Sequence, residues 1–250
     1  MSVVAPPLIR VQRPIVAAAI GAAWGAALLA QTTNLGERWH HDQLIEGELP
    51  FWMALVVFIA VWQIHVTAMM LPSSLPMITV FEHAARRDSQ PRRSMAAFLT
   101  GCAAVWSAFG LLAFTGDAGL HAGIERWPWL HDHPSFIAGT VLITAGLFQF
   151  TGLKDRCLKQ CRHPAAFLLR HYRRGPTNAF RLGLRHAVFC VGCCWALMLV
   201  MFAVGVANVT WMAPFALLMF VERVMPRGDG AVVPAGLALT MLGLLVVVHP

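Results

Sequence analysis

Soft sulfur and imidazole side chains recur along one apolar stretch of the sequence, residues 184–206. His186, Cys190, Cys193, Cys194 and Met198 follow one another there at intervals of one, three or four residues. On an α-helix these spacings place the side chains on one broad face. Thiolate and thioether ligands with imidazole suit Cu(I) best and Zn(II) next, whereas oxygen ligands suit Mg²⁺ or Ca²⁺. The pattern therefore predicts a site for a soft metal ion, with copper first and zinc second.

Ligands on adjacent turns of a single helix cannot enclose an ion tetrahedrally, so the predicted site needs help from other segments. Suitable side chains occur near the end of a second apolar run, on a basic amphipathic stretch and near the end of a sixth apolar run. All of them are expected at the same level of the membrane as the cysteines. These additional candidate ligands are His65, Met69, Met70, Cys157, Cys161 and Glu222.

Each of these residues also has a structural interpretation. A cysteine in an apolar helix is commonly a small packing residue, and methionine commonly fills gaps. The spacing of Cys190 and Cys193 matches a dithiol redox pair, which predicts a membrane thiol oxidoreductase as one alternative. His65 and His186 as axial ligands of a haem predict a b-type cytochrome, a weaker alternative. A structural or assembly subunit of a larger membrane complex is the third alternative.

The composition indicates a membrane protein. Hydrophobic residues make up 58% of the 250 residues, charged residues make up 12%, and the mean hydropathy is +0.63. A soluble globular domain of this length has a far less apolar composition. Apolar runs of about 20 residues match a hydrocarbon thickness of roughly 30 Å. We predict an all-α, polytopic bundle forming one integral membrane domain, with seven spans at about 14–33, 50–71, 95–116, 134–152, 184–206, 209–226 and 231–249, and an amphipathic cytoplasmic segment at 153–182.

The distribution of basic residues predicts the orientation. Lysine and arginine in short loops remain on the cytoplasmic side. With a cytoplasmic N-terminus, all of the 19 lysines and arginines except Arg38 and Arg126 lie inside. The net charge of +7 then reflects topology and contact with anionic lipids, and it is poor evidence for nucleic acid binding. This arrangement is expected in the inner membrane of a bacterium.

Histidines also occur in the two loops predicted on the outer side. Paired or alternating histidines are able to capture a divalent cation, although solvated loop histidines are the simpler interpretation. Neighbouring tryptophans are expected to anchor these loops at the headgroup level. The outer histidines are His40, His41, His121, His131 and His133.

Four segments carry a resemblance to a known family. They are "TAMMLPSSLP", "LFQFTGLKDRCLKQCRHPAAFL", "GLRHAVFCVGCCWALMLVMFAVGVANVTWM" and "VERVMP". The chain resembles, over residues 50–228, a bacterial family of predicted metal-binding integral membrane proteins that constitutes a domain of unknown function. Arg223 stands where that family usually has lysine. The residues that match its motifs are Met69, Met70, Pro72, Cys157, Cys161, His186, Cys190, Cys193, Cys194, Asn208, Trp211, Met212 and Glu222.

Together these patterns predict a metal-handling membrane protein. Its expected role is to bind Cu(I) for transport or for delivery to a membrane or periplasmic metalloprotein. No loop of the GxxxxGK[ST] type occurs in the sequence, so this chain is not expected to drive transport with ATP by itself. We therefore expect a binding protein more than an enzyme.

Overall fold

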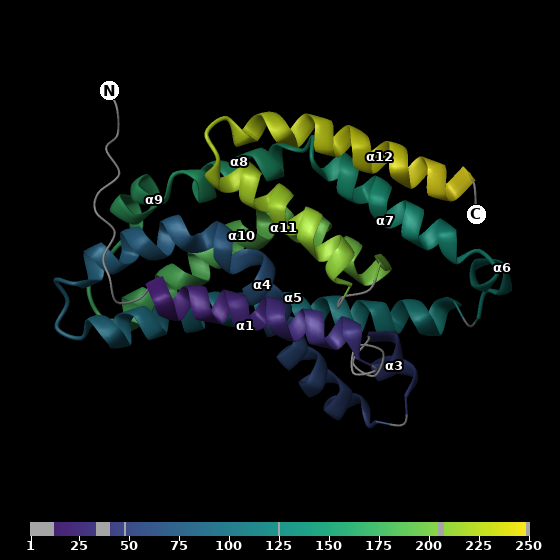
Figure 1. Ribbon diagram of the computed structural model, residues 1–250, viewed down its shortest axis with the longest axis horizontal. Coiled ribbons are helices and arrows are strands. Elements are labelled where there is room, and N and C mark those ends of the chain that lie inside the picture. Colours follow the sequence, from purple (N-terminus) through teal and green to yellow (C-terminus); the bar gives the residue numbers. More distant parts are fainter. Residues whose placement is uncertain (1–12, 34–40, 48, 125, 205–207, 249–250) are drawn as a thin grey trace.

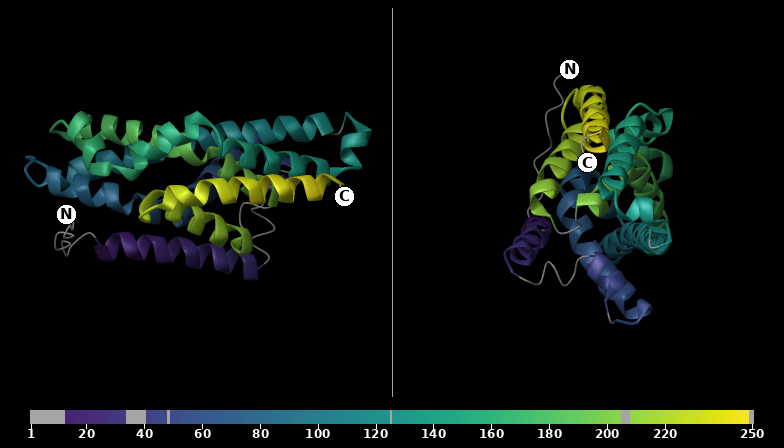
Figure 2. Two further views of the ribbon diagram at one scale, coloured as in Figure 1. Left: turned by 90° about the horizontal axis from the view of Figure 1, so that it is seen from above. Right: turned by 90° about the vertical axis from the view of Figure 1, so that its right-hand side faces the viewer.

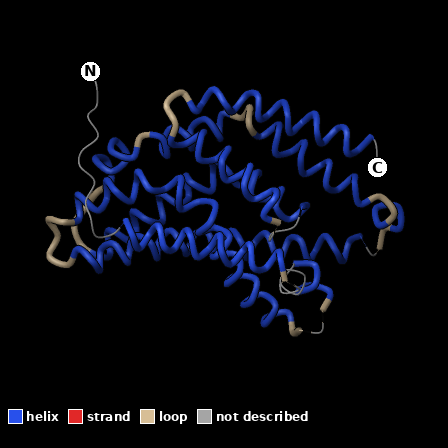
Figure 3. Tube along the Cα trace, viewed as in Figure 1, coloured by secondary structure: helices blue, strands red, loops and turns tan. Residues whose placement is uncertain are grey.

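The computed structural model describes residues 13–33, 41–47, 49–124, 126–204 and 208–248. Within these ranges the chain is helical and contains no strand (Figure 3). The predicted all-α class is therefore confirmed. The elements in chain order are α1 (Arg13–Thr32), α3 (His41–Glu46), α4 (Phe51–Ala85), α5 (Pro91–Ile124), α6 (Pro128–His131), α7 (Pro134–Phe148), α8 (Gly152–Arg162), α9 (Pro164–His171), α10 (Pro176–Val204), α11 (Val209–Val224), the 3₁₀ turn η1 (Gly228–Ala231) and α12 (Val232–Val248).

Five helical segments are long and apolar enough to cross a membrane. They are α1, α4, α5, α10 and the segment from η1 through α12. A sixth span results if α7 and α8, which meet at a bend of 66°, count as one. Since α11 has only 16 residues, it is shorter than any of the five. A membrane protein is thus supported, and the count of seven spans stays a prediction.

Helix α4 runs further than the apolar run of residues 50–71 indicated. It continues to Ala85 with Pro72 and Pro76 inside it. Proline lacks an N–H, so Pro72 leaves the carbonyl of Ala68 without its helical donor. The indole Nε1 of Trp24 on α1 donates to this oxygen at 3.1 Å. The proline therefore creates an acceptor that docks α1 onto α4.

The predicted amphipathic segment of residues 153–182 divides into α8, α9 and the first turns of α10. Thr151 caps α8, because its hydroxyl accepts a hydrogen bond from the backbone N–H of Lys154. Pro164 opens α9 and Pro176 opens α10, the position in which proline is compatible with a helix. Consequently α10 begins eight residues before the predicted span and carries its cysteines near the middle of a 29-residue helix.

Two loops meet at one end of the bundle, where α4 ends and α10 begins (left in Figure 1). The carboxylate of Asp88 accepts hydrogen bonds from Ser94 Oγ at 2.6 Å and from the backbone N–H of Gly175 at 2.9 Å. These hydrogen bonds lower the pKa of Asp88 below its usual value, and the bond from Ser94 contributes most. Gly175 has a φ of +99°, which suits glycine. The loop contacts thereby fix the start of α10 next to the α4–α5 connection.

Helices α5 and α10 cross in close contact, and α1 lies at the rim of the bundle (Figure 2). A Cβ atom at Gly101 of α5 would collide with the backbone of Phe180, and one at Gly183 of α10 would collide with the backbone of Phe98. Small residues at such crossings let helix backbones approach each other. The crossing fixes the depth of α10, and with it the position of the cysteines.

Candidate metal centre

Three helices bring sulfur atoms together inside the bundle. Cys194 of α10 lies with its Sγ 3.8 Å from the Sδ of Met70 on α4. Cys161 of α8 lies with its Sγ 3.9 Å from the Sγ of Cys193 on α10. With Cys190, these residues form what we call the sulfur cluster: Met70, Cys161, Cys190, Cys193 and Cys194. All six cysteines of the chain are free thiols.

The backbone of α10 positions three of the thiols. Cys193 and Cys194 each place their Sγ against the carbonyl oxygen of Cys190, at 3.1 and 3.0 Å. Gly192 of α10 faces α8. A Cβ atom at Gly192 would be only 2.7 Å from the Sγ of Cys157 on α8. Because glycine lets α8 approach, Cys161, one turn beyond Cys157, reaches Cys193.

The guanidinium of Arg223 on α11 lies in the sulfur cluster. Its Nη2 donates to the Sγ of Cys193 at 3.0 Å and to the Sγ of Cys194 at 3.3 Å. Its Nη1 donates to the hydroxyl of Ser73 at 2.9 Å and lies 3.7 Å from the Sδ of Met70. The residue is 5% exposed. The positively charged guanidinium of Arg223 therefore lies between the sulfur atoms of the cluster.

A buried ion pair adjoins the cluster. Lys154 Nζ lies 2.7 Å from Glu222 Oε2, and both side chains are almost fully buried. Within the described part of the chain, no carboxylate lies within ion-pair distance of Arg223. The nearest groups that are able to carry its counter-charge are the thiols of Cys193 and Cys194.

Among the predicted ligands, the structure brings together the five members of the sulfur cluster, from α4, α8 and α10. The sulfurs of these three helices lie side by side, and a metal site between the helices stays a prediction. Met69 and Met198 are buried in the same hydrophobic core. Cys157 packs against Gly192 on the flank of the cluster.

The remaining three candidates have other neighbours. His65 stacks on the ring of Trp62, with centroids 5.4 Å apart. His186 lies between Phe98 and Phe167, with ring centroids at 6.0 and 5.9 Å. Glu222 pairs with Lys154 at 2.7 Å.

Among the described residues, no group of three or more His, Cys, Asp or Glu side chains is arranged to hold a metal ion. The centre of the cluster contains Arg223 instead, and one of the surrounding soft atoms is a methionine sulfur. A metal ion would bind here to the sulfurs that now accept hydrogen bonds from the guanidinium.

The sequence pattern does not identify Arg223 and Lys154 as parts of the site. The distribution of basic residues predicts both at the cytoplasmic surface. A signal was present, because Glu222 and Arg223 follow directly on an apolar helix, and charged residues in such positions need buried partners. Only packing shows which partners they have.

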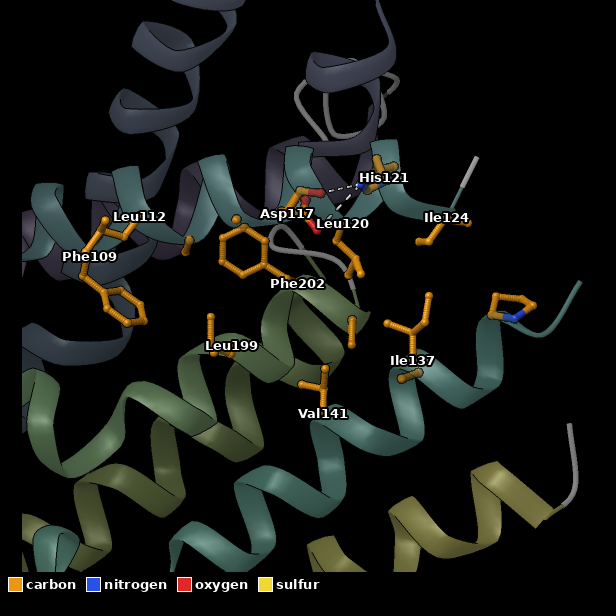
Figure 4. Close-up of a pocket in the computed structure, with 15 residues that line it drawn as sticks. Phe109, Leu112, Asp117, Leu120, His121, Ile124, Ile137, Val141, Leu199 and Phe202 are labelled. Atoms are coloured by element: carbon orange, nitrogen blue, oxygen red, sulfur yellow. Dashed lines mark hydrogen bonds and ion pairs between the residues drawn. The ribbon is translucent and has the colours of Figure 1, made fainter. Parts of the chain in front are cut away.

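The end of the bundle predicted on the outer side contains a cavity. A cavity of about 570 Å³ between α5, α7 and α10 is lined mainly by apolar side chains. Figure 4 shows His121 in its wall next to Asp117; the Nδ1 of His121 lies 3.0 Å from the Asp117 backbone oxygen. His133 likewise contacts the carbonyl of Trp129 through Nδ1, at 2.7 Å. Metal capture by the outer histidines stays a prediction; His40, and the side chains of His41 and His131, lie outside the described residues.

Comparisons with known proteins identify the family. No curated protein and no solved structure matches the chain. A family model for PpoB2, described as a copper chaperone, matches residues 59–246. The match covers most of the chain and includes every residue of the sulfur cluster together with Arg223. The chain therefore belongs to the PpoB2 family of copper chaperones.

Proposed function

We propose that this protein is a membrane-embedded carrier of Cu(I), with the sulfur cluster and Arg223 as its binding site. The ion is cargo: it is bound between helices and passed on to a membrane or periplasmic metalloprotein. The observation that carries the proposal is the guanidinium of Arg223 held by the sulfurs of Cys193 and Cys194. Copper handling agrees with the family and is favoured over a thiol oxidoreductase, a b-type cytochrome or a purely structural subunit.

Charge balance supports a monovalent ion. Cu(I) bound to two thiolates carries one net negative charge, which the guanidinium of Arg223 neutralises. Zn(II) with the same two thiolates and the arginine would leave one net positive charge. Net charge in a buried site is costly, so this set of residues favours Cu(I).

The spacing of the sulfurs also supports the proposal. Metal–sulfur bonds of about 2.3 Å at a tetrahedral angle place two sulfurs roughly 3.8 Å apart. The two contacts between helices, Cys194–Met70 and Cys161–Cys193, are 3.8 and 3.9 Å long. Each pair is thus spaced as two ligands of one ion would be.

Arg223 variants test the charge argument. We expect Arg223→Met to lower Cu(I) affinity at least about tenfold, because the copper–thiolate complex then keeps an unbalanced buried charge. Arg223→Lys retains the positive charge, so its Cu(I) affinity is expected to fall less than that of Arg223→Met. Cu(I) affinity is measured anaerobically by competition with a chelator. The number of protons released per bound copper is expected to rise in Arg223→Met, because without the guanidinium the thiols keep their protons until copper binds. Arg86→Met is the arginine control, since Arg86 lies at the C-terminal end of α4 and pairs with Glu82. Equal or tighter binding by Arg223→Met would mean that the guanidinium competes with copper instead of balancing its complex.

The proposal places the N-terminus and the basic end of the bundle in the cytoplasm of a bacterium, with the site reached from the inner leaflet. Ser89 and Asp132 are exposed in loops at opposite ends. In a background in which the native cysteines are replaced, we expect Asp132→Cys to react with an impermeant maleimide in intact spheroplasts. Ser89→Cys is expected to react only after permeabilisation. The reverse pattern would invert the orientation and give the site access from the outer side.

A further inference from the structure

A cavity of about 280 Å³ adjoins the sulfur cluster between α4, α5 and α10. Two cluster residues, Met70 and Cys190, form part of its wall. His186 and Cys102 line it as well. The cavity therefore joins a second group of soft side chains to the first through shared residues.

The imidazole of His186 is an unexplained buried polar group. The residue is 7% exposed, and its Nε2 has no hydrogen-bond partner among the described residues. A buried polar atom without a partner costs free energy, so its presence calls for a ligand or an ordered water. Phe98 and Phe167 flank the ring, which leaves the cavity as the nearest open space.

Cys102 provides a second soft donor in the same wall. Its Sγ lies 3.5 Å from the carbonyl oxygen of Gly183, a weak contact that ligand binding can replace. Imidazole and thiolate together suit Cu(I), and an oxygen-preferring ion would find only the amide of Gln63 and the hydroxyls of Thr67 and Ser74 here. Cu(I) is stable with as few as two soft ligands. It therefore does not require the convergent group of three that the described residues lack.

We propose that this cavity is a second Cu(I) position, formed by the two soft ligands His186 and Cys102, from which the ion passes along the shared residue Cys190 to the sulfur cluster. The inference rests on the proposed function, since it assigns a route to the same cargo. The transfer is a ligand exchange without change of oxidation state. Copper leaves the imidazole nitrogen of His186 and the sulfur of Cys102, and it binds the sulfurs of Cys193 and Cys194, which lose their protons. One proton returns to Cys102 and the other leaves to solvent, so the final complex has two thiolates whose net charge Arg223 balances. Cys190, which lies in both walls, contacts the ion as a thiol during the exchange. Met70, shared by both walls, is the second residue able to assist the exchange.

The test counts copper per chain in the full-length protein, reconstituted in lipid nanodiscs and titrated anaerobically with Cu(I) against a chelator. Wild-type protein is expected to bind two ions. The variant His186→Phe with Cys102→Ala, which keeps a ring between Phe98 and Phe167, is expected to bind one. X-ray absorption is expected to show nitrogen and sulfur ligands in the wild type and sulfur alone in this variant.

Two controls keep the two proposals distinguishable. His171→Phe removes a histidine whose Nδ1 contacts the Phe167 carbonyl outside the cavity, and Ser74→Ala alters the cavity wall without removing a soft ligand. Both are expected to bind two ions. One sulfur-only ion in wild type and in the His186→Phe, Cys102→Ala variant would overturn the second position and leave the cluster intact. No bound copper in the wild type would overturn the proposed function as well.

Discussion

Replacing both Cys193 and Cys194 by serine is expected to remove Cu(I) from the sulfur cluster while the protein stays folded. Serine has nearly the size of cysteine, but its hydroxyl is a hard ligand with little affinity for Cu(I). We expect the affinity of the cluster to fall at least about a hundredfold, which corresponds to roughly 2.7 kcal/mol of binding free energy. The measurement is an anaerobic Cu(I) titration with chelator competition, together with metal analysis after identical purification.

Cys157→Ser is the matched control for this variant. Cys157 is a buried cysteine of the same region, but it packs against Gly192 and not against Arg223. The same chemical change there is expected to leave copper binding within a few-fold of wild type. If the double serine variant and the wild type retain equal copper, the sulfur cluster is packing and the copper proposal fails. If the double serine variant keeps its copper but loses thiol–disulfide exchange activity that the wild type shows, the cysteines are better explained as a redox dithiol.

Glu222→Gln is expected to cause the largest loss of stability. The substitution leaves the ammonium of Lys154 buried at 1% exposure without its carboxylate. Breaking a buried ion pair by removing one partner costs about 3–5 kcal/mol, because the other charge stays uncompensated. We expect a clear fall in the melting temperature of the protein in detergent, measured by loss of native fluorescence or by aggregation.

A double variant separates the charge effect from loss of packing. Lys154→Met with Glu222→Gln removes both charges and is expected to recover much of the lost stability.

Asp155→Asn is a control that breaks an exposed ion pair on α8. The side chains of Asp155 and its partner Lys159 are 59% and 64% exposed. Exposed pairs contribute at most about 1 kcal/mol, so little change is expected there. A Glu222→Gln protein as stable as the Asp155→Asn protein would show that the buried pair contributes little.

The fold class and part of the candidate site could be predicted from the sequence. Apolar runs of membrane-spanning length require backbone hydrogen bonds within each segment, so they are helical wherever they lie. Helical periodicity then placed Cys190, Cys193 and Cys194 on one face of α10, because side chains three and four residues apart share a face. The need for ligands from other helices followed from coordination geometry, and Met70 and Cys161 were among the candidates.

The tertiary structure decided what these residues face. Helix α4 continues past Pro72, and the carbonyl of Ala68 that the proline leaves free accepts a hydrogen bond from Trp24, which lies 44 residues away. The burial of Arg223 depends on the sulfurs of two other helices. Charge counting along the chain cannot distinguish a loop arginine in water from one held between thiols, because the two differ only in what surrounds them. The sequence by itself thus determined the helices and the chemistry of their faces, whereas the close crossing at Gly101 and Gly183, which fixes the depth of α10, decided which faces meet.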